Sequence, residues 1–325
     1  MITMAEIARL TRVSQPTVSR VLNGNQAVDP EIRERVLACA REHDYQLNAL
    51  AKSLQGSKTN LLGVIFNDMS NSFFAGLAKE IEAKAREHGY SMILFNSDHD
   101  PQRQREYMDV VRRYRVDGVL ITPTLRNMAV WQECVGKLDV PAVVVTRRVE
   151  DLDSIYLDHE DAARLVARHL AERNYEQFLF IGRQTDSKYK GFSEELKAMG
   201  LCPTGEVRYF ECEDDGEFLR ELKKHLSRSE CRTGIFANND LWALRTLRAL
   251  RELDVSVPEK VGVIGFDNIS MGRYFYPSLS SVSQPIAQMA DEAVSRLVYR
   301  INHQDELKLL DLPMRVALVQ REHII

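Results

Sequence analysis

Polar side chains suited to contact with nucleic acid are concentrated in the segment SQPTVSRVLNGN, residues 14–25. Glutamine can pair with adenine and arginine with guanine through two hydrogen bonds each, so Gln15 and Arg20 are the candidates for contacting base edges. A helix, a tight turn and a second helix with such side chains at its start match the geometry that places a helix in the major groove. The side chains better suited to phosphates, which position a protein without selecting sequence, are Thr17, Ser19 and Asn23.

Spacing alone also fits an ordinary amphipathic surface helix. Val18, Val21 and Leu22 recur at intervals that place them on one face, where they could pack against any core. The polar residues would then be no more than a solvated outer face. Both interpretations remain open on spacing alone.

The elements that must position this segment are three short helices near the start of the chain. Thr3 and Glu6 form a capping box, in which each side chain satisfies a free backbone N–H of the first turn. Ser14 can cap the second helix. Asp29 followed by Pro30 predicts the start of the third, because proline lacks only an N–H that would be unpaired there. Three helices in about forty residues predict a small bundle.

From residue 61 onward, apolar strands alternate with helical stretches. Continuous apolar strands joined by helical crossovers predict parallel sheets covered on both faces. The number of strands favours two doubly wound lobes with a ligand cleft between them. The predicted strands are 61–66, 91–95, 118–122, 142–145, 178–182, 207–210, 234–237, 261–266 and 315–321, and the predicted helices are 72–88, 101–114, 126–137, 160–173, 188–199, 215–228, 240–253 and 291–301.

The composition of the 325 residues, 44% hydrophobic and 28% charged, is that of a globular protein. The net charge of −4 is uneven, because the first 60 residues carry +2 and the remainder −6. We find no apolar run near the roughly 18 residues of a membrane span and no signal peptide, so we expect a cytosolic protein that does not bind membranes. Five scattered cysteines show no zinc-binding spacing, and no metal or cofactor is implied.

The sequence argues against two other classes of protein. An enzyme is disfavoured because the chain has no G-x-G-x-x-G after a strand, no Walker A loop, no G-x-S-x-G and no H-E-x-x-H. The polar triplet His159-Glu160-Asp161 lies at a predicted helix start, where acidic and capping residues are expected. A secreted sugar receptor would fit the two lobes, but it would not need residues 1–58.

The first fifty residues resemble the DNA-binding headpiece of the lactose/galactose repressor family. The specific motifs are TVSRVLN and NALAKSL. The resemblance implies that the second helix enters the major groove, with Gln15, Pro16 and Arg20 selecting bases. The positions that it assigns to DNA contact are Thr3, Ser14, Gln15, Pro16, Thr17, Ser19, Arg20, Asn23, Asn48, Ala51 and Leu54.

The stretch NALAKSL resembles the family's hinge helix, which orders on operator DNA and enters the minor groove. Leu54 matches the leucine that wedges between central base pairs, a role whose alternative is a buried helix leucine. Two hinges must pair across a dyad, which implies a homodimer on a near-palindromic operator. Two residues depart from the family: Leu47 replaces a proline, and Arg12 replaces a glycine, at a cost of about 1 kcal/mol if its backbone is left-handed.

The rest of the chain resembles the family's two-lobe effector domain, which is similar to periplasmic sugar-binding proteins. Carboxylates and amides beside aromatic faces suit a polyol. Plain alternatives exist, since Asp240 could cap a helix, Phe73 and Phe74 could be core, and Asn239 could be a turn residue. The positions that the resemblance assigns to effector binding are Asp68, Phe73, Phe74, Arg147, Lys188, Asn239, Asp267 and Gln284.

The stretch FIGRQTDSKYKGFSEEL departs most from the family. Lys188 stands where an arginine usually clamps the effector, and lysine lacks the bidentate fork. With Arg147, Arg183 and Lys190 nearby, several positive charges could converge on the cleft. They suggest an anionic effector, a sugar acid or a sugar phosphate. The alternative is that these lysines are solvated on a helix face.

The expected fold is an all-α helix-turn-helix headpiece joined to an α/β effector domain of two parallel-sheet lobes. The expected function is that of a carbohydrate-responsive transcriptional repressor, without enzymatic activity. The last residues, QREHII, add no heptads, so we expect a dimer and no tetramer-forming tail. The expected domains are a headpiece (1–45), a hinge and linker (46–60) and an effector domain (61–325), with a first lobe of about 61–154 and 286–313 and a second of about 155–285 and 314–325.

Overall fold

The chain divides into two compact units, Met1–Thr59 and Asn60–Ile325, in a computed structural model. The predictions for Asn23, Leu47, Asn48, Ala51 and Leu54, and most of those for helix 126–137, lie outside the residues that the structure describes. These residues are 2–22, 24–25, 27–45, 58–124, 131, 135–136, 138–202, 207–212, 214–227, 230–303, 305 and 308–324.

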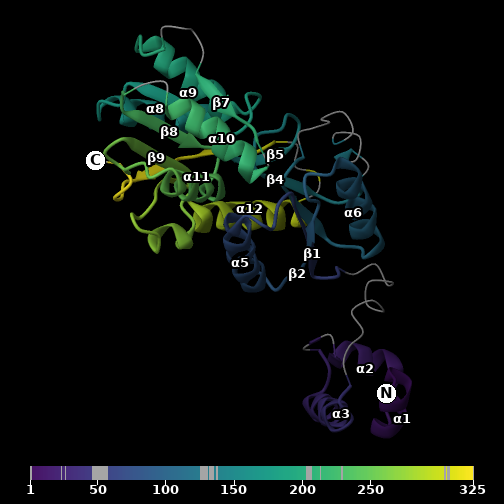
Figure 1. Cartoon of the computed structure of the whole chain (residues 1–325). Coiled ribbons are helices and arrows are strands. Elements are labelled where there is room, and N and C mark those ends of the chain that lie inside the picture. The colour runs from purple at the N-terminus through teal and green to yellow at the C-terminus, as the bar shows by residue number, and fades with distance from the viewer. Residues whose placement is uncertain are drawn as a thin grey trace. The chain divides into compact units, whose positions relative to one another are not determined.

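The described residues of the first unit form the three predicted helices, which Figure 1 shows grouped together and which share a small core. The capping box between Thr3 and Glu6 is present, and Asp29 accepts hydrogen bonds from the first turn of the third helix, as predicted. Val18, Val21 and Val36 are buried between the helices. The helices are α1 (Met4–Thr11), α2 (Gln15–Leu22) and α3 (Pro30–Glu42).

The turn between α1 and α2 has the left-handed backbone that the missing glycine implied. Arg12 has φ 55° and ψ 40°, and the N–H of the next residue, Val13, donates to the carbonyl of Ala8. This hydrogen bond belongs to a Schellman motif, in which glycine is the usual left-handed residue. Arg12 therefore carries a backbone strain that glycine would not.

Within the described residues, the second unit contains two six-stranded sheets, ordered β11-β5-β4-β3-β1-β2 and β12-β10-β9-β8-β6-β7. All neighbouring strands are parallel except β10 and β12, which confirms the predicted parallel two-lobe architecture. The strands are β1 (Leu61–Phe66), β2 (Ser91–Asn96), β3 (Gly118–Ile121), β4 (Ala142–Thr146), β5 (Asp153–Leu157), β6 (Gln177–Ile181), β7 (Arg208–Phe210), β8 (Thr233–Ala237), β9 (Val261–Asp267), β10 (Ser280–Ser283), β11 (Asp311–Met314) and β12 (Ala317–Val319).

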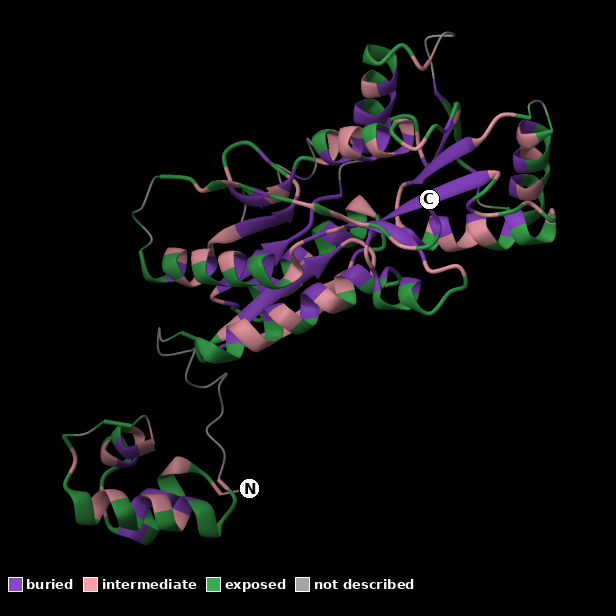
Figure 2. Cartoon of the chain, turned by 90° about the vertical axis from the view of Figure 1, so that its left-hand side faces the viewer, coloured by how far each residue is buried: buried purple, intermediate pink, exposed green. Residues whose placement is uncertain are grey.

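Helices cover both faces of each sheet, and Figure 2 shows their exposed sides turned away from the buried strands. Helices α5 and α12 pack on one face of the first sheet, and α6 packs on the other. In the second lobe α8 and α9 cover one face, whereas α10 and α11 cover the opposite one. The helices are α5 (Ser72–Glu87), α6 (Pro101–Arg113), α8 (His159–Ala171), α9 (Ser187–Ala198), α10 (Asp215–Leu226), α11 (Asp240–Glu252) and α12 (Ile286–Asn302), with a short 3-10 helix η2 (Ser270–Arg273).

Three short strands were not predicted: β5, β10 and β11. Strand β10 has the sequence SSVS, yet Ser280 and Ser281 are fully buried because hydrogen bonds satisfy both hydroxyls. Such a strand lacks the apolar pattern by which strands are recognised. Strands β5 and β11 pair with each other in the first sheet. The first passage of the chain through this sheet therefore ends at Leu157, and the last passage ends at Met314.

The described residues contain no group of three or more histidine, cysteine or acidic side chains that could hold a metal ion. None of the helices in this part of the chain is long and apolar enough to cross a membrane.

Candidate functional sites

The exposed face of α2 presents the residues that the family resemblance assigned to DNA bases. Gln15, Pro16 and Arg20 are exposed, whereas Val18 and Val21 of the same helix are buried. In the described part of the first unit, the side chains of Gln15 and Arg20 form no hydrogen bond or ion pair. Their donors and acceptors are therefore available to an external partner.

Three hydroxyls assigned to DNA contact, of which only that of Thr17 was assigned to phosphates, already take part in local hydrogen bonds. Those of Ser14 and Thr17 lie 2.8 Å apart, and Ser14 Oγ also accepts from the Thr17 N–H. Thr3 donates to Glu6 within the capping box. Each of the three is exposed or partly buried, so contact with a phosphate would have to share the hydroxyl. Ser19 is partly buried on α2.

The candidate effector residues all follow the carboxyl ends of parallel strands in the second unit. Ligands bind at this edge in open α/β sheets, where loops and helix starts provide polar groups. A hydrogen bond of 2.7 Å from Asn71 Nδ2 to Asp267 Oδ2 joins the edge of the first sheet to that of the second. The residues are Asp68, Phe73 and Phe74 after β1, Arg147 after β4, Lys188 after β6, Asn239 after β8, Asp267 at the end of β9 and Gln284 after β10.

Asp267 lies at the centre of this arrangement. Only 6% exposed, it accepts from Asn71 through one carboxylate oxygen and from Gln284 Nε2 through the other, at 2.5 Å. Burial raises its pKa to about 6, against the opposing influence of Lys188 and of these two hydrogen bonds. The Gln284 Oε1 is itself buried with no hydrogen-bond partner. The site therefore retains an unsatisfied acceptor beside a carboxylate.

Lys188 is 8% exposed and belongs to the same cluster. Its ammonium donates to the backbone and side-chain oxygens of Asn238, at 2.8 and 2.9 Å, and lies 4.2 Å from the centre of the Phe266 ring. Burial lowers the pKa of Lys188, while Asp186 and Asp267 raise it. Lys188 is thus a buried cation, not a solvated surface lysine.

The expected convergence of further positive charges on the cleft is wrong for two residues. Lys190 is 58% exposed and pairs with Glu160 at 3.0 Å. Arg183 is 44% exposed and pairs with Glu211 at 2.7 Å. Successive residues of a helix point about 100° apart, so Lys188 and Lys190, two positions apart, cannot face the same side.

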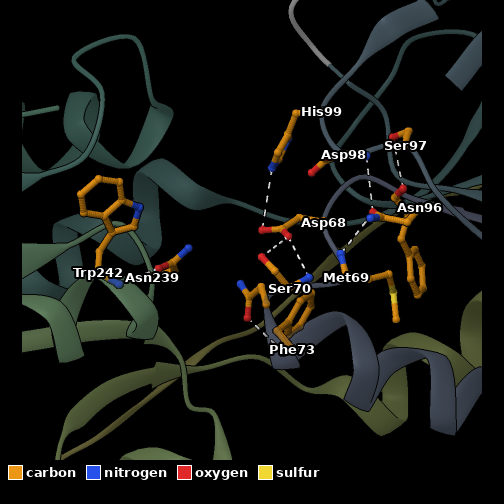
Figure 3. Close-up of polar contacts among 12 residues, drawn as sticks. Asp68, Met69, Ser70, Phe73, Asn96, Ser97, Asp98, His99, Asn239 and Trp242 are labelled. Atoms are coloured by element: carbon orange, nitrogen blue, oxygen red, sulfur yellow. Dashed lines mark hydrogen bonds and ion pairs between the residues drawn. The ribbon is translucent and has the colours of Figure 1, made fainter. Parts of the chain in front are cut away.

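Asp68 faces the cleft from the first lobe, and Figure 3 shows it opposite Asn239 and Trp242 of α11. Its carboxylate accepts from the Ser70 N–H and hydroxyl, and His99 Nε2 lies 3.9 Å away. Burial would raise the pKa of Asp68, but the interactions with His99 and Ser70 outweigh it and lower the pKa to about 2. Asp68 is therefore ionised.

The aromatic candidates differ in exposure. Phe73 is 3% exposed and packs in the core of the first lobe, as its plain alternative held. Phe74 is only partly buried, with its ring 5.3 Å from that of Phe66 and 5.0 Å from that of Phe73. Of the two, Phe74 has more surface to offer a ligand.

Asn239, and not Asp240, caps α11. Asn239 Oδ1 accepts from the Trp242 N–H at 3.0 Å, which leaves its amide nitrogen for a ligand. Asp240 is 1% exposed and accepts from Ser281 and from the Ile269 N–H. Burial raises the pKa of Asp240 to about 7. Asp240 thus ties α11 to β10 beneath the site.

Arg147 projects from a strained position. Thr146, immediately before it, has φ 77°, which is unusual for a β-branched residue. Backbone strain of this kind is concentrated at functional sites. Among the described residues Arg147 has no hydrogen bond or ion pair. Burial is the main cause that lowers the pKa values of Lys188 and His159, and the nearby charge of Arg147 lowers both further.

Several members of the cluster were not predicted from the sequence. Asn71 and Asn238 bind Asp267 and Lys188, and His99 lies beside Asp68. His159 stacks on Phe266 with ring centres 5.7 Å apart, and burial together with Lys188 lowers its pKa well below the usual value. The polar triplet containing His159 and the amide before the NSFF phenylalanines were visible signals, but their partners are distant in sequence.

Both units match families of known proteins. Residues 3–48 match the family model for bacterial regulatory proteins of the lacI family, and residues 167–322 match a periplasmic binding protein-like domain. The sucrose operon repressor of Pediococcus pentosaceus is 31% identical over 303 residues, covering 91% of each chain. The chain belongs to the LacI family.

Solved structures show the same architecture as this LacI-family chain. A LacI-type regulator from Alkaliphilus metalliredigens in complex with D-xylulofuranose is 29% identical, with a TM-score of 0.69, and the match covers 82% of this chain and 99% of that one. The Lac repressor dimer bound to operator and an anti-inducer is 24% identical, with a TM-score of 0.85 over 99% and 98% of the two chains. At that identity, the second match shows the fold alone.

Proposed function

We propose that this chain is a transcriptional repressor that binds a near-palindromic operator through α2 and the hinge segment and controls genes of carbohydrate use. The exposed Gln15, in the first turn of α2, and Arg20, in its last turn, carry the DNA-binding part of the proposal, because among the described residues both side chains are free to contact base edges. As a DNA-binding regulator it would act on chromosomal DNA in the cytoplasm. The effector would bias the arrangement of the lobes. The protein's affinity for the effector and its affinity for the operator would therefore be linked.

The preferred effector is a neutral sugar held around Asp267. The carboxylates of Asp267, Asp68 and Asp186 surround the cations of Lys188 and Arg147. The cluster therefore has no excess of positive charge that an anionic effector would need to neutralise. Carboxylates and amides in this arrangement suit vicinal hydroxyls. The related sucrose operon repressor and the regulator in complex with D-xylulofuranose support a carbohydrate of this kind.

A sugar acid or sugar phosphate is the second candidate, favoured by Arg147. An arginine that follows β4 and has no partner among the described residues can form a bidentate pair with a carboxylate or a phosphate. Lys190 and Arg183 add no support, because both are paired elsewhere.

A homodimer is the proposed functional form, because a single headpiece has one short α2 and a near-palindromic operator has two half-sites. The proposed contact between copies is the segment that follows β9. Tyr274 and Tyr276 are 85% and 95% exposed there, next to the 56% exposed Met271. A cluster of apolar side chains this exposed typically marks an interface.

Selection of random duplex DNA on the purified full-length chain tests the function. It would be repeated with sugars, sugar acids and sugar phosphates. We expect an enriched palindrome whose binding changes with one class of ligand. Weaker binding would identify an inducer, and stronger binding a corepressor. No enriched sequence under any ligand would refute the proposal, and a response to acids or phosphates alone would replace the neutral sugar with the second candidate.

A further inference from the structure

Arg12 occupies a backbone position that favours glycine. It is the left-handed residue of the Schellman turn that ends α1, with φ 55°. A side chain in this region meets the following carbonyl oxygen, so any residue with a Cβ destabilises the turn relative to glycine. Nothing in the turn itself requires an arginine.

Among the described residues, nothing bound to the Arg12 side chain offsets this strain. The side chain is exposed, and in the described part of the first unit it has neither a hydrogen bond nor an ion pair. Arg41, by comparison, pairs with Glu34 at 2.6 Å on α3. A strained residue without an internal partner suggests an external one.

The location of Arg12 indicates the chemistry of that partner. Arg12 lies two residues before Ser14, whose hydroxyl caps α2, and three before the exposed Gln15. In this motif the first helix crosses the phosphate backbone and the start of the recognition helix enters the major groove, so the turn that joins them must lie near the backbone at the groove's edge. A planar guanidinium pairs with phosphate through two hydrogen bonds.

We propose that Arg12 binds an operator phosphate beside the start of α2 and so anchors the recognition helix. The inference rests on the proposed DNA-binding function, to which it adds a contact made by a residue that was expected only to strain the turn. The contact is to the backbone, so it raises affinity for any duplex and does not select bases. It also makes binding more sensitive to salt, because each phosphate contact releases counterions.

The test uses the full-length chain and three variants. Arg12→Gly removes both the charge and the strain, and Arg12→Lys keeps the charge. Arg41→Gln removes the same charge at the last turn of α3, as a matched control. Affinity would be measured by fluorescence anisotropy from about 50 to 200 mM salt, on the selected palindrome and on the same duplex with that site scrambled.

We expect Arg12→Gly to weaken binding to both duplexes by about tenfold at 0.1 M salt and to reduce the slope of log affinity against log salt by about 0.9. Arg12→Lys should keep most of the slope, and Arg41→Gln should leave it unchanged. In hydrogen-exchange measurements, Arg12→Gly should also slow exchange of the α1 and α2 amides by roughly fivefold, because the turn loses its strain.

A variant that is better protected but binds DNA less well cannot be explained by damage to the fold. An unchanged slope in Arg12→Gly, or an equal loss in Arg41→Gln, would overturn the inference while the DNA-binding function stands. A change in the preferred sequence with an unchanged slope would also overturn it, because Arg12 would then contact a base. Failure of the wild-type chain to distinguish the two duplexes would instead refute the proposed function.

Discussion

The Asn71 side-chain amide donates to the carboxylate of Asp267 across 196 residues of sequence and from one lobe to the other. The same asparagine caps α5, because its Oδ1 accepts from the Phe73 N–H at 3.0 Å. The Asn71 side chain therefore caps a helix of the first lobe and also donates a hydrogen bond to the buried carboxylate of Asp267 in the second lobe. A ligand hydroxyl that approaches Asp267 must share or displace this hydrogen bond.

Asn71→Ser separates these two roles. Serine caps helices as well as asparagine does, but its side chain is too short to reach Asp267. The buried carboxylate loses a donor, which should destabilise the ligand-free second unit by about 1–3 kcal/mol. Thermal unfolding and small-angle X-ray scattering should show a lower midpoint and a larger radius of gyration. Unchanged values for both would mean that the hydrogen bond does not hold the lobes together.

Lys188→Met and Lys190→Met form a matched pair for the effector site. Methionine at 188 removes the donors to Asn238 and the cation beside Asp267. We expect effector affinity, measured by isothermal titration calorimetry with the sugar found in the selection, to fall roughly 10- to 100-fold. Lys190→Met breaks only an exposed pair with Glu160 and should change affinity by less than about twofold. Equal effects would contradict the assignment of Lys188 to the site.

Asp240→Asn tests the buried carboxyl at the start of α11. The pKa of Asp240 is raised from 3.8 to about 7, so between these values the folded chain holds a proton that the unfolded chain has lost. This carboxyl therefore lowers stability as pH rises through that window. Asparagine mimics the protonated form, so the variant should gain stability relative to wild type as pH rises, by roughly 4 kcal/mol at pH 7.5. Urea unfolding at several pH values measures the difference, and parallel curves would exclude the effect.

Gly191→Ala should disrupt the packing of α8 on α9. A Cβ at this position would overlap the backbone carbonyl of Glu160, which cannot move without displacing α8. We expect a loss of about 1–3 kcal/mol, or more, in the free energy of unfolding. Gly216→Ala is the control, because its Cβ meets nothing closer than the Asp214 side chain at 3.3 Å on the exposed α10. It should be neutral or stabilising by up to about 1 kcal/mol.

Tyr276→Glu tests the proposed contact between copies. A charge at a 95% exposed aromatic position costs nothing in a monomer but is unfavourable in an apolar interface. We expect the variant to dissociate at concentrations where the wild type is dimeric and to lose most operator affinity. Analytical ultracentrifugation checks the first result. A variant dimer as stable as the wild type would place the interface elsewhere.

Most helices and apolar strands could be predicted, because their signals are local. The capping box of Thr3 and Glu6 spans three residues, and the cap at Asp29 spans two or three. Strands such as β1 and β9 are continuous apolar runs. The left-handed turn at Arg12 also followed from its position in a recognisable motif. Strand β10 could not be predicted, because its buried serines depend on partners more than ten residues away.

The amino-acid sequence by itself determined the family, the two kinds of unit and the residue types at the carboxyl ends of the strands. Short-range hydrogen bonds and apolar periodicity act within a few residues, so they are visible in one dimension. Only the tertiary structure decided that Lys188 is buried while Lys190 pairs with Glu160, and that Asn71 meets Asp267. These outcomes depend on which distant groups the fold brings within hydrogen-bond range, because burial and charge pairing depend on three-dimensional surroundings.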